Sequence, residues 1–148
     1  MTRRGAVVLV WLLAVLAATA PRASAQSLPE SLAGTAWRLI EFRSSEDEIA
    51  VLRPTDPSLY TMSLGENGSV SMRLDCNRAS GTWSASTAGG SFGFGDLRMT
   101  RVVCQQPSLD QHIARHAEYV SSFMVRDGLL YLNLIADGGT YVWEPLGH

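Results

Sequence analysis

The chain of 148 residues contains two cysteines, Cys76 and Cys104, and each lies within a short polar segment. An even and minimal cysteine count in an exported protein favours a single structural disulfide. Redox-active cysteines are usually separated by two intervening residues, and thiolate metal sites usually contain more than two cysteines. A disulfide here would close a long loop and contribute roughly 3 to 4 kcal/mol in the chain-entropy estimate. We therefore expect a domain in which two distant segments are tied together.

The N-terminus has the pattern of a secretory signal peptide. Arg3 and Arg4 precede an apolar stretch over residues 6–16, and small residues lead up to Ala25. This order of a basic, an apolar and a small-residue region is typical of a cleaved export signal. The apolar stretch is shorter than the ~20 residues that a membrane span requires. The sequence therefore predicts a signal peptide over residues 1–25, cleaved after Ala25.

Cleavage would leave residues 26–148, enough for one domain with one hydrophobic core. Residues 26–31 are expected to form a short linker, and residues 32–146 the folded domain. No cysteine follows the apolar stretch closely enough to carry a lipid anchor. We expect a periplasmic or secreted protein without stable membrane insertion.

The mature chain would be acidic, and this limits its partners. Signal cleavage removes three of twelve arginines and leaves fourteen acidic side chains, for a net charge of about −5. Nucleic acids and anionic membranes are bound through clusters of basic residues. The chain contains no lysine, which excludes Schiff-base chemistry. Nucleic acid is therefore not expected as a partner.

Alternating apolar and polar residues predict β-strands over most of the mature chain. Asn67-Gly68 and Asp137-Gly138-Gly139 fall where tight turns between strands are required. The segment 43–57 reads as a loop that contains a short edge strand over residues 49–52. The other expected strands cover residues 34–42, 60–64, 70–74, 82–84, 91–95, 129–135 and 140–143.

One helix is expected among the strands. Ser108 and Gln111 form a capping-box pattern directly after Pro107. Apolar residues then recur at spacings of three and four, which predicts one apolar helix face; they are Leu109, Ile113, Ala117, Val120 and Met124. A single amphipathic helix needs a sheet to cover. The predicted fold is α+β, with a strongly curved antiparallel sheet of about seven or eight strands wrapping a single α-helix, and one disulfide.

His112 and His116 lie four residues apart on the predicted helix, a spacing that lets two imidazoles share a metal ion. No Glu follows His112, and the sequence places no third ligand beside them. We interpret both histidines as flanks of the apolar helix face. The expectation is therefore no metal site and no cofactor.

Four motifs occur in a fixed order along residues 32–143: Gly34-Thr35-x-Trp37-Arg38-Leu39, Pro57-x-Leu59, Cys76-Asn77-x-x-x-Gly81-x-Trp83 and Thr100-Arg101-x-x-Cys104. In this order they resemble the META domain, or HslJ-type, family of bacterial envelope and secreted proteins. Two positions depart from the family pattern. Asp75 stands in place of a glycine before the first cysteine, and Val102-Val103 stand in place of Met-Ala before the second.

The resemblance implies an antiparallel sheet curved around one helix, a periplasmic or secreted location, and no enzymatic activity. Proteins of this family are linked to heat-inducible envelope stress, antibiotic tolerance or secretion. The resemblance also singles out four motif residues, Asn77, Arg78, Thr100 and Arg101. In one interpretation Asn77 and Thr100 hydrogen-bond the backbone near the disulfide, and the arginines pair with carboxylates. In the other, the four residues form a polar patch for an acidic partner.

No motif in the chain indicates a reaction. No Ser/His/Asp group can be assembled from the sequence. We therefore expect a non-catalytic envelope or secreted module that binds a protein partner or assists envelope integrity and stress tolerance. The alternative is a binder of a small ligand or lipid, or an enzyme-inhibitor-like domain, that uses a groove between sheet and helix.

Overall fold

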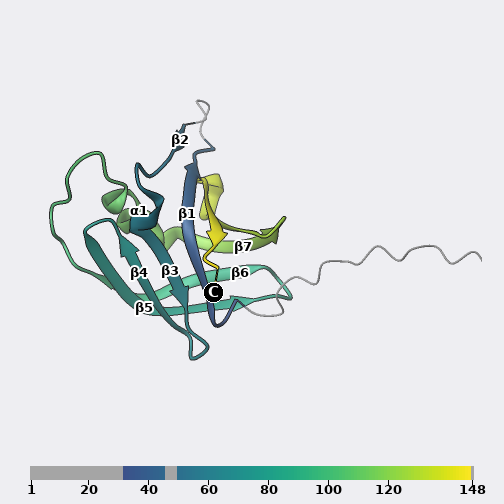
Figure 1. The fold of residues 1–148 in the computed structure, drawn as a ribbon. Coiled ribbons are helices and arrows are strands. Elements are labelled where there is room, and N and C mark those ends of the chain that lie inside the picture. The colour runs from purple at the N-terminus through teal and green to yellow at the C-terminus, as the bar shows by residue number, and fades with distance from the viewer. Residues whose placement is uncertain (1–31, 46–49, 148) are drawn as a thin grey trace, which may run out of the picture.

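The computed structural model describes residues 32–45 and 50–147, so the predicted signal peptide and linker lie outside the described residues. Within the described part, nine antiparallel strands form one sheet in the order β2-β1-β3-β4-β5-β6-β7-β8-β9, and β1 also pairs with β9. The sheet thereby closes into an eight-stranded barrel with β2 added outside it (Figure 1). No helix within the described ranges has the length and apolarity to cross a membrane.

The elements follow one another along the chain with short connections. The strands are β1 (Thr35–Arg43), β2 (Val51–Leu52), β3 (Tyr60–Leu64), β4 (Ser69–Leu74), β5 (Asn77–Ser86), β6 (Ser91–Met99), β7 (Val120–Arg126), β8 (Leu129–Leu134) and β9 (Thr140–Pro145). The helical segments are η1 (Pro57–Leu59), α1 (Asp110–His116), η2 (Ala117–Tyr119) and η3 (Ile135–Asp137).

The hairpin of β3 and β4 forms as its alternating pattern predicts. Tyr60, Met62 and Leu64 are buried on β3, and Met62 pairs with Met72 of β4. The turn places Gly68 at φ +78°, a conformation that glycine adopts without steric cost. One face of this hairpin therefore belongs to the barrel interior, and the other carries polar side chains.

In β1, the set of alternate side chains that points into the barrel changes partway along the strand. Trp37 and Leu39 are buried, and then the register against β9 shifts between Leu39 and Glu41. The extra residue at such a bulge moves the following side chains to the opposite face. As a result Phe42, which simple alternation from Leu39 would place outside, is buried.

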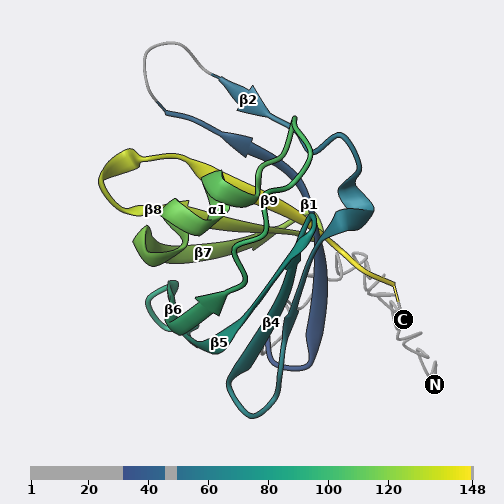
Figure 2. The same cartoon turned by 90° about the vertical axis from the view of Figure 1, so that its left-hand side faces the viewer.

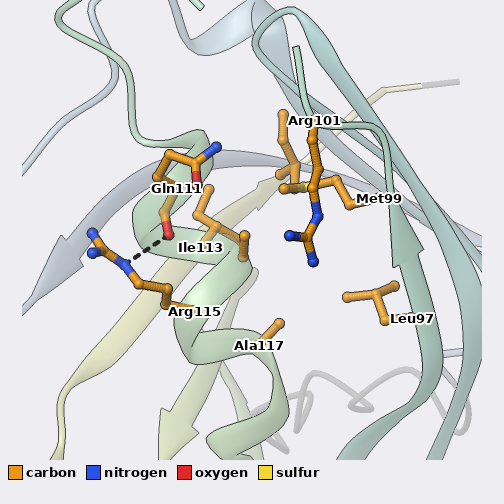
Figure 3. A pocket seen from close by; sticks show the side chains of 9 residues that line it. Leu97, Met99, Arg101, Gln111, Ile113, Arg115 and Ala117 are labelled. Carbon is orange, nitrogen blue, oxygen red and sulfur yellow. Dashed lines mark hydrogen bonds between the residues drawn. The ribbon is translucent and has the colours of Figure 1, made fainter. Parts of the chain in front are cut away.

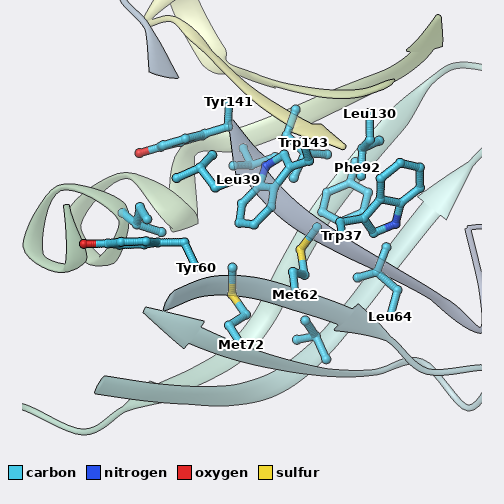
Figure 4. Packing of buried hydrophobic residues seen from close by; sticks show 14 of the residues in the cluster. Trp37, Leu39, Tyr60, Met62, Leu64, Met72, Phe92, Leu130, Tyr141 and Trp143 are labelled. Atoms are coloured by element: carbon cyan, nitrogen blue, oxygen red, sulfur yellow. The ribbon is translucent and has the colours of Figure 1, made fainter. Parts of the chain in front are cut away.

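The barrel interior is filled by large side chains from its different walls (Figure 4). Fully buried examples are Leu39 from β1, Met62 from β3, Leu132 from β8 and Trp143 from β9. Burial of such a side chain contributes on the order of 1.5–3 kcal/mol. The core is therefore continuous across the barrel.

Strands β5 and β6 extend further than the sequence predicted, and they pass a local irregularity. Their register shifts between Ser80 and Thr82. At Gly81, a Cβ atom would lie 2.7 Å from the carbonyl oxygen of Gly95. Because real Cβ atoms do not approach backbone this closely, the position requires glycine.

The predicted helix is shorter than its apolar stripe. The helix α1 covers seven residues, whereas Val120 and Met124 lie on β7. A tight turn explains the strand, because Asp127 and Gly128 both have positive φ and join β7 to β8 as a hairpin. The capping box also does not form, since the N-cap residue is Leu109, which makes no side-chain cap hydrogen bond.

The relation between helix and sheet also differs from the prediction. The sheet closes on itself, and α1 covers one end of the barrel instead of being wrapped by the predicted strongly curved sheet (Figure 2). Strands β6 and β7 share a single bridge, Ser91 with Ser122, so they diverge toward that end. Residues 100–119 form the connection that returns from β6 to β7 there. This connection carries the second cysteine and the helix.

Candidate functional site

The disulfide lies where the chain leaves β6 for α1. Cys76 and Cys104 are bonded, with their Cα atoms 5.6 Å apart, and the described residues include no free cysteine. The bond ties the residue before β5 to the connection between β6 and α1. The predicted pairing is therefore confirmed, and we call residues 100–104 the disulfide loop.

The side chain of Asn77 holds the backbone of the disulfide loop through hydrogen bonds. It is fully buried at the first position of β5, a strand that begins before the predicted residues 82–84. Its Oδ1 accepts hydrogen bonds from Thr100 Oγ1 at 2.8 Å and from the Val102 amide at 2.9 Å. Its Nδ2 donates to the Val102 carbonyl at 2.9 Å and to Asp110 Oδ2 at 3.0 Å. One amide side chain thus connects β5, the disulfide loop and α1.

Asp110 is a buried acidic residue that the sequence analysis missed. Its carboxylate accepts from Ser108 Oγ at 2.9 Å and from Gln111 Nε2 at 2.9 Å, in addition to Asn77. Burial alone would raise the pKa of Asp110, but the hydrogen bonds from Gln111, Ser108 and Asn77 outweigh it and lower the pKa. An acidic residue in the first turn of a predicted helix was the available signal.

Tyr60 holds the start of the helix against β3. Its hydroxyl oxygen accepts a hydrogen bond from the Leu109 amide at 3.0 Å and lies 3.1 Å from Ser108 Oγ. The helix end is therefore fixed by a side chain from another strand instead of by the predicted capping box.

Thr100 and Arg78 extend the β5–β6 ladder by one step. Thr100 Oγ1 accepts from the Arg78 amide at 3.0 Å, and the Thr100 amide donates to the Arg78 carbonyl at 2.9 Å. The Arg78 guanidinium donates to the backbone carbonyls of Asn77 and Asp75. Arg101 has no hydrogen bond or ion pair with any residue of the described ranges. The expectation that both arginines pair with carboxylates was therefore wrong.

The disulfide loop presents apolar side chains to solvent. Val102 is 57% exposed and Val103 is 93% exposed, although the Val102 backbone is hydrogen-bonded at both its amide and its carbonyl. Arg78 and Arg101 are also exposed beside them. The motif therefore separates into a buried part, Asn77 with Thr100 Oγ1, and an exposed part.

A cavity of about 300 Å³ lies between β6 and α1, in the region where the alternative interpretation of the sequence placed a groove between sheet and helix. Figure 3 shows the Arg101 guanidinium between the helix and the side chains of Leu97 and Met99. The cavity is lined by Leu74, Leu97, Met99, Arg101, Gln111, Ile113, Ala114, Arg115 and Ala117.

His112 and His116 lie side by side and belong to an aromatic cluster. The His112 ring centroid is 4.4 Å from that of His116 and 4.4 Å from that of Phe42, and His112 Nδ1 lies 3.0 Å from the Tyr141 hydroxyl. Burial, aided by the charges of His116 and Arg115, lowers the pKa of His112 to about 4. In the part of the chain that the structure describes, no three potential metal ligands gather at one point.

The fold and the disulfide-tied strand pair define a small antiparallel domain closed by one helix. The family model of the META domain matches residues 30–144. The chain therefore belongs to the META domain family, in agreement with the order of its sequence motifs. Family membership by itself assigns no reaction and no partner.

Two of the solved structures with a similar fold are of bacterial proteins. An NMR structure of a protein from Burkholderia xenovorans matches with a TM-score of 0.64 and 21% sequence identity, covering 79% of this chain and 85% of that chain. A crystal structure of a DUF4847 family protein from Bacteroides vulgatus matches with a TM-score of 0.57 and 10% identity, covering 78% and 94%. No curated protein matches the chain. At these identities the similarity concerns the fold alone.

Proposed function

We propose that this protein is a non-catalytic module of the bacterial envelope, or a secreted one, that binds a protein partner through its disulfide loop and Arg78. The partner would offer acidic side chains to Arg78 and Arg101 and an apolar contact to Val102 and Val103. Such binding would serve envelope integrity or stress tolerance.

The observation that carries the proposal is that exposed side chains stand on a fixed backbone. Val103 is 93% exposed, yet the loop is held on one side by the disulfide and on the other by Asn77. A loop that is ordered before binding loses little conformational entropy when a partner binds. A fixed apolar contact next to cations therefore supports a role in recognition.

The two arginines support an acidic partner. Neither guanidinium pairs with a carboxylate among the described residues, so both can donate hydrogen bonds to carboxylates of a partner protein. Arginine is enriched at protein interfaces because its planar group forms paired hydrogen bonds with carboxylates. The charges would then set the orientation of the partner, and the valines would contribute buried apolar area.

A non-catalytic role agrees with the chemistry of the side chains. Both sulfur atoms are joined to each other, so neither can serve as a thiolate nucleophile. His112 lies against Phe42 and Tyr141, and its lowered pKa leaves it neutral near pH 7. These features support a structural use of residues that often act in catalysis.

The proposal includes export. The signal pattern over residues 1–25 and the disulfide both support a location outside the cytosol, where disulfides persist. Mass spectrometry of the mature protein from the exporting cell would give an N-terminus at Gln26. An uncleaved N-terminus in that fraction would contradict this part of the proposal.

The binding surface is tested by crosslinking in cells followed by mass spectrometry. The native protein should capture a defined partner, and the double variant Arg78→Ala/Arg101→Ala should lose it. Arg126→Ala, which removes an exposed arginine from β7, is the matched control and should keep the partner. An unchanged partner set in the double variant would overturn the proposed surface.

A further inference from the structure

We propose that the cavity between β6 and α1 binds a small amphipathic anion, a carboxylate carried on a short hydrocarbon tail. This goes beyond the protein-binding role, because it assigns a ligand of a different class to a cavity that shares only Arg101 with the proposed protein surface. The inference rests on the composition of the cavity walls, on the Arg101 guanidinium beside the cavity, and on the cavity volume.

Apolar side chains contribute to both walls of the cavity, beside the polar side chains of Arg101, Gln111 and Arg115. Leu97 and Met99 line it from β6, while Ile113 and Ala117 line it from the helical side. Ile113 and Ala117 are four residues apart, so they share one face of the helical segment. Leu74 of β4 also lines the cavity. These side chains offer a hydrocarbon tail a place away from water, which is favourable in proportion to the area it buries.

Arg101 gives the cavity a positive group at its rim. The Arg101 guanidinium projects toward the space between helix and strand (Figure 3), and it has no polar partner within residues 32–45 and 50–147. Arg115 also lines the cavity, but its guanidinium extends away from Arg101 (Figure 3), and its Nε donates to the Gln111 carbonyl at 3.2 Å. None of the nine lining residues is acidic. A guanidinium binds a carboxylate through two parallel hydrogen bonds, so this rim favours a carboxylate over a neutral or cationic head.

The position of Arg101 is fixed by the same network that orders the disulfide loop. Its two neighbours in sequence, Thr100 and Val102, both hydrogen-bond Asn77. The backbone of Arg101 is therefore held before any ligand arrives, which lowers the cost of placing its charge on an anion.

The volume limits the size of the ligand. A cavity of about 300 Å³ lies at the lower end of the range for small-molecule sites. It suits one short alkyl chain and not the two long chains of a phospholipid. The inferred ligand is therefore a medium-chain carboxylate or a compound that carries such a group.

The test is a titration of the mature, oxidised protein with octanoate at pH 7, followed by two-dimensional amide NMR. Saturable shifts should centre on Leu97, Met99, Ile113 and Ala117. Octan-1-ol and octyltrimethylammonium have the same tail without the negative charge, and each should bind at least tenfold more weakly. Equal affinity for all three compounds would contradict the inferred binding of the carboxylate by Arg101.

Two variants separate the charge from the cavity. Arg101→Gln should weaken octanoate binding about tenfold, as loss of a charge-assisted hydrogen bond does. Arg98→Gln, on β6 between Leu97 and Met99 but outside the cavity lining, should leave affinity unchanged. Ala117→Leu fills the cavity and should abolish binding; if that variant does not fold, Ala114→Leu on the same wall replaces it. Unchanged affinity in Arg101→Gln, or in a folded cavity-filling variant, would overturn the proposal.

The cavity and the protein surface can fail independently. Val103→Ser alters the exposed loop but none of the lining residues, so it should weaken partner capture and leave octanoate binding intact. Ala117→Leu should do the reverse. Scattered shifts that do not saturate would mean binding at high concentration only and would reject the site.

Discussion

The buried amide of Asn77 donates a hydrogen bond of 3.0 Å to the carboxylate of Asp110, and this contact joins the first residue of β5 to the first residue of α1. Both side chains are almost fully removed from solvent. A buried polar group without a partner is costly, so each residue depends on the other. The pair explains how a seven-residue helix, too short to be stable alone, keeps a defined position on the barrel end.

The Asn77 network predicts a large stability effect for Asn77→Ala. The change leaves the Val102 amide and carbonyl and the Asp110 carboxylate short of partners, and the cost is about 3 kcal/mol of unfolding free energy. Chemical denaturation of the oxidised protein measures this loss. Ser80→Ala, at an exposed position of the same strand, should change stability by less than about 0.5 kcal/mol. Equal effects of the two variants would show that the network contributes little.

The disulfide predicts a second effect of similar size. The cysteines are separated by 28 positions, and opening such a loop costs roughly 3.5 kcal/mol in the chain-entropy estimate. The variant Cys76→Ser/Cys104→Ser should lose about this amount in denaturation, and a reductant should destabilise the native protein but not the variant. A native protein whose stability is insensitive to the reductant would contradict the structural role of the bond.

Much of the barrel was predictable because its strands are short and amphipathic. The alternation of Tyr60, Met62 and Leu64 identifies one strand, and Asn67-Gly68 identifies its turn. Such signals are local, since each depends on neighbouring residues only. Closure of the sheet was not predictable in this way, because the pairing of β1 with β9 joins opposite ends of the domain.

The apolar spacing that predicted the helix gave a wrong C-terminal end for it. Val120 and Met124 continue the helical spacing of Ile113 and Ala117, yet both belong to β7. The Asp127-Gly128 turn favours a hairpin, and pairing with β8 prevails over the helical periodicity. That dipeptide was the signal that could have corrected the prediction.

The site was identified only in outline. The motif spacing selected Asn77 and Thr100, but it gave no indication that Asp110 completes their network. Nor did the motif spacing indicate that Arg78 and Arg101 do not pair with carboxylates among the described residues, because the sequence does not contain the distances between side chains. The cavity beside Arg101 likewise depends on where α1 comes to lie on the barrel.

The bulge in β5 makes Gly81 intolerant of any side chain. A methyl group there would meet the Gly95 carbonyl oxygen at 2.7 Å, so Gly81→Ala should cost about 2 kcal/mol or more. Gly93→Ala is the matched control on β6, where an added Cβ has no neighbour within 4 Å, and it should be nearly neutral. Thermal or chemical unfolding compares the two. A tolerated Gly81→Ala would mean that the backbone at the bulge can relax.

His112 gives stability a pH dependence in a defined window. Its pKa is about 4 in the folded protein against 6.5 for an unperturbed histidine, chiefly because burial disfavours the charged ring. The unfolded chain therefore binds a proton that the folded protein does not, and stability should fall as the pH decreases from about 7 to about 4. His112→Gln should flatten the curve of unfolding free energy across this window. An equally steep curve in the variant would assign the effect to other groups.

As proposed above, the motif around the disulfide is a buried scaffold that presents an exposed recognition surface. The most direct measurement places a photo-crosslinking side chain at Val103 in the exported protein, and the same side chain at Ser86, an exposed position at the far end of β5. The account predicts one defined crosslinked partner from position 103 that is absent from position 86 and is lost when Arg78 and Arg101 are changed to Ala. Identical products from both positions, insensitive to the arginines, would contradict it.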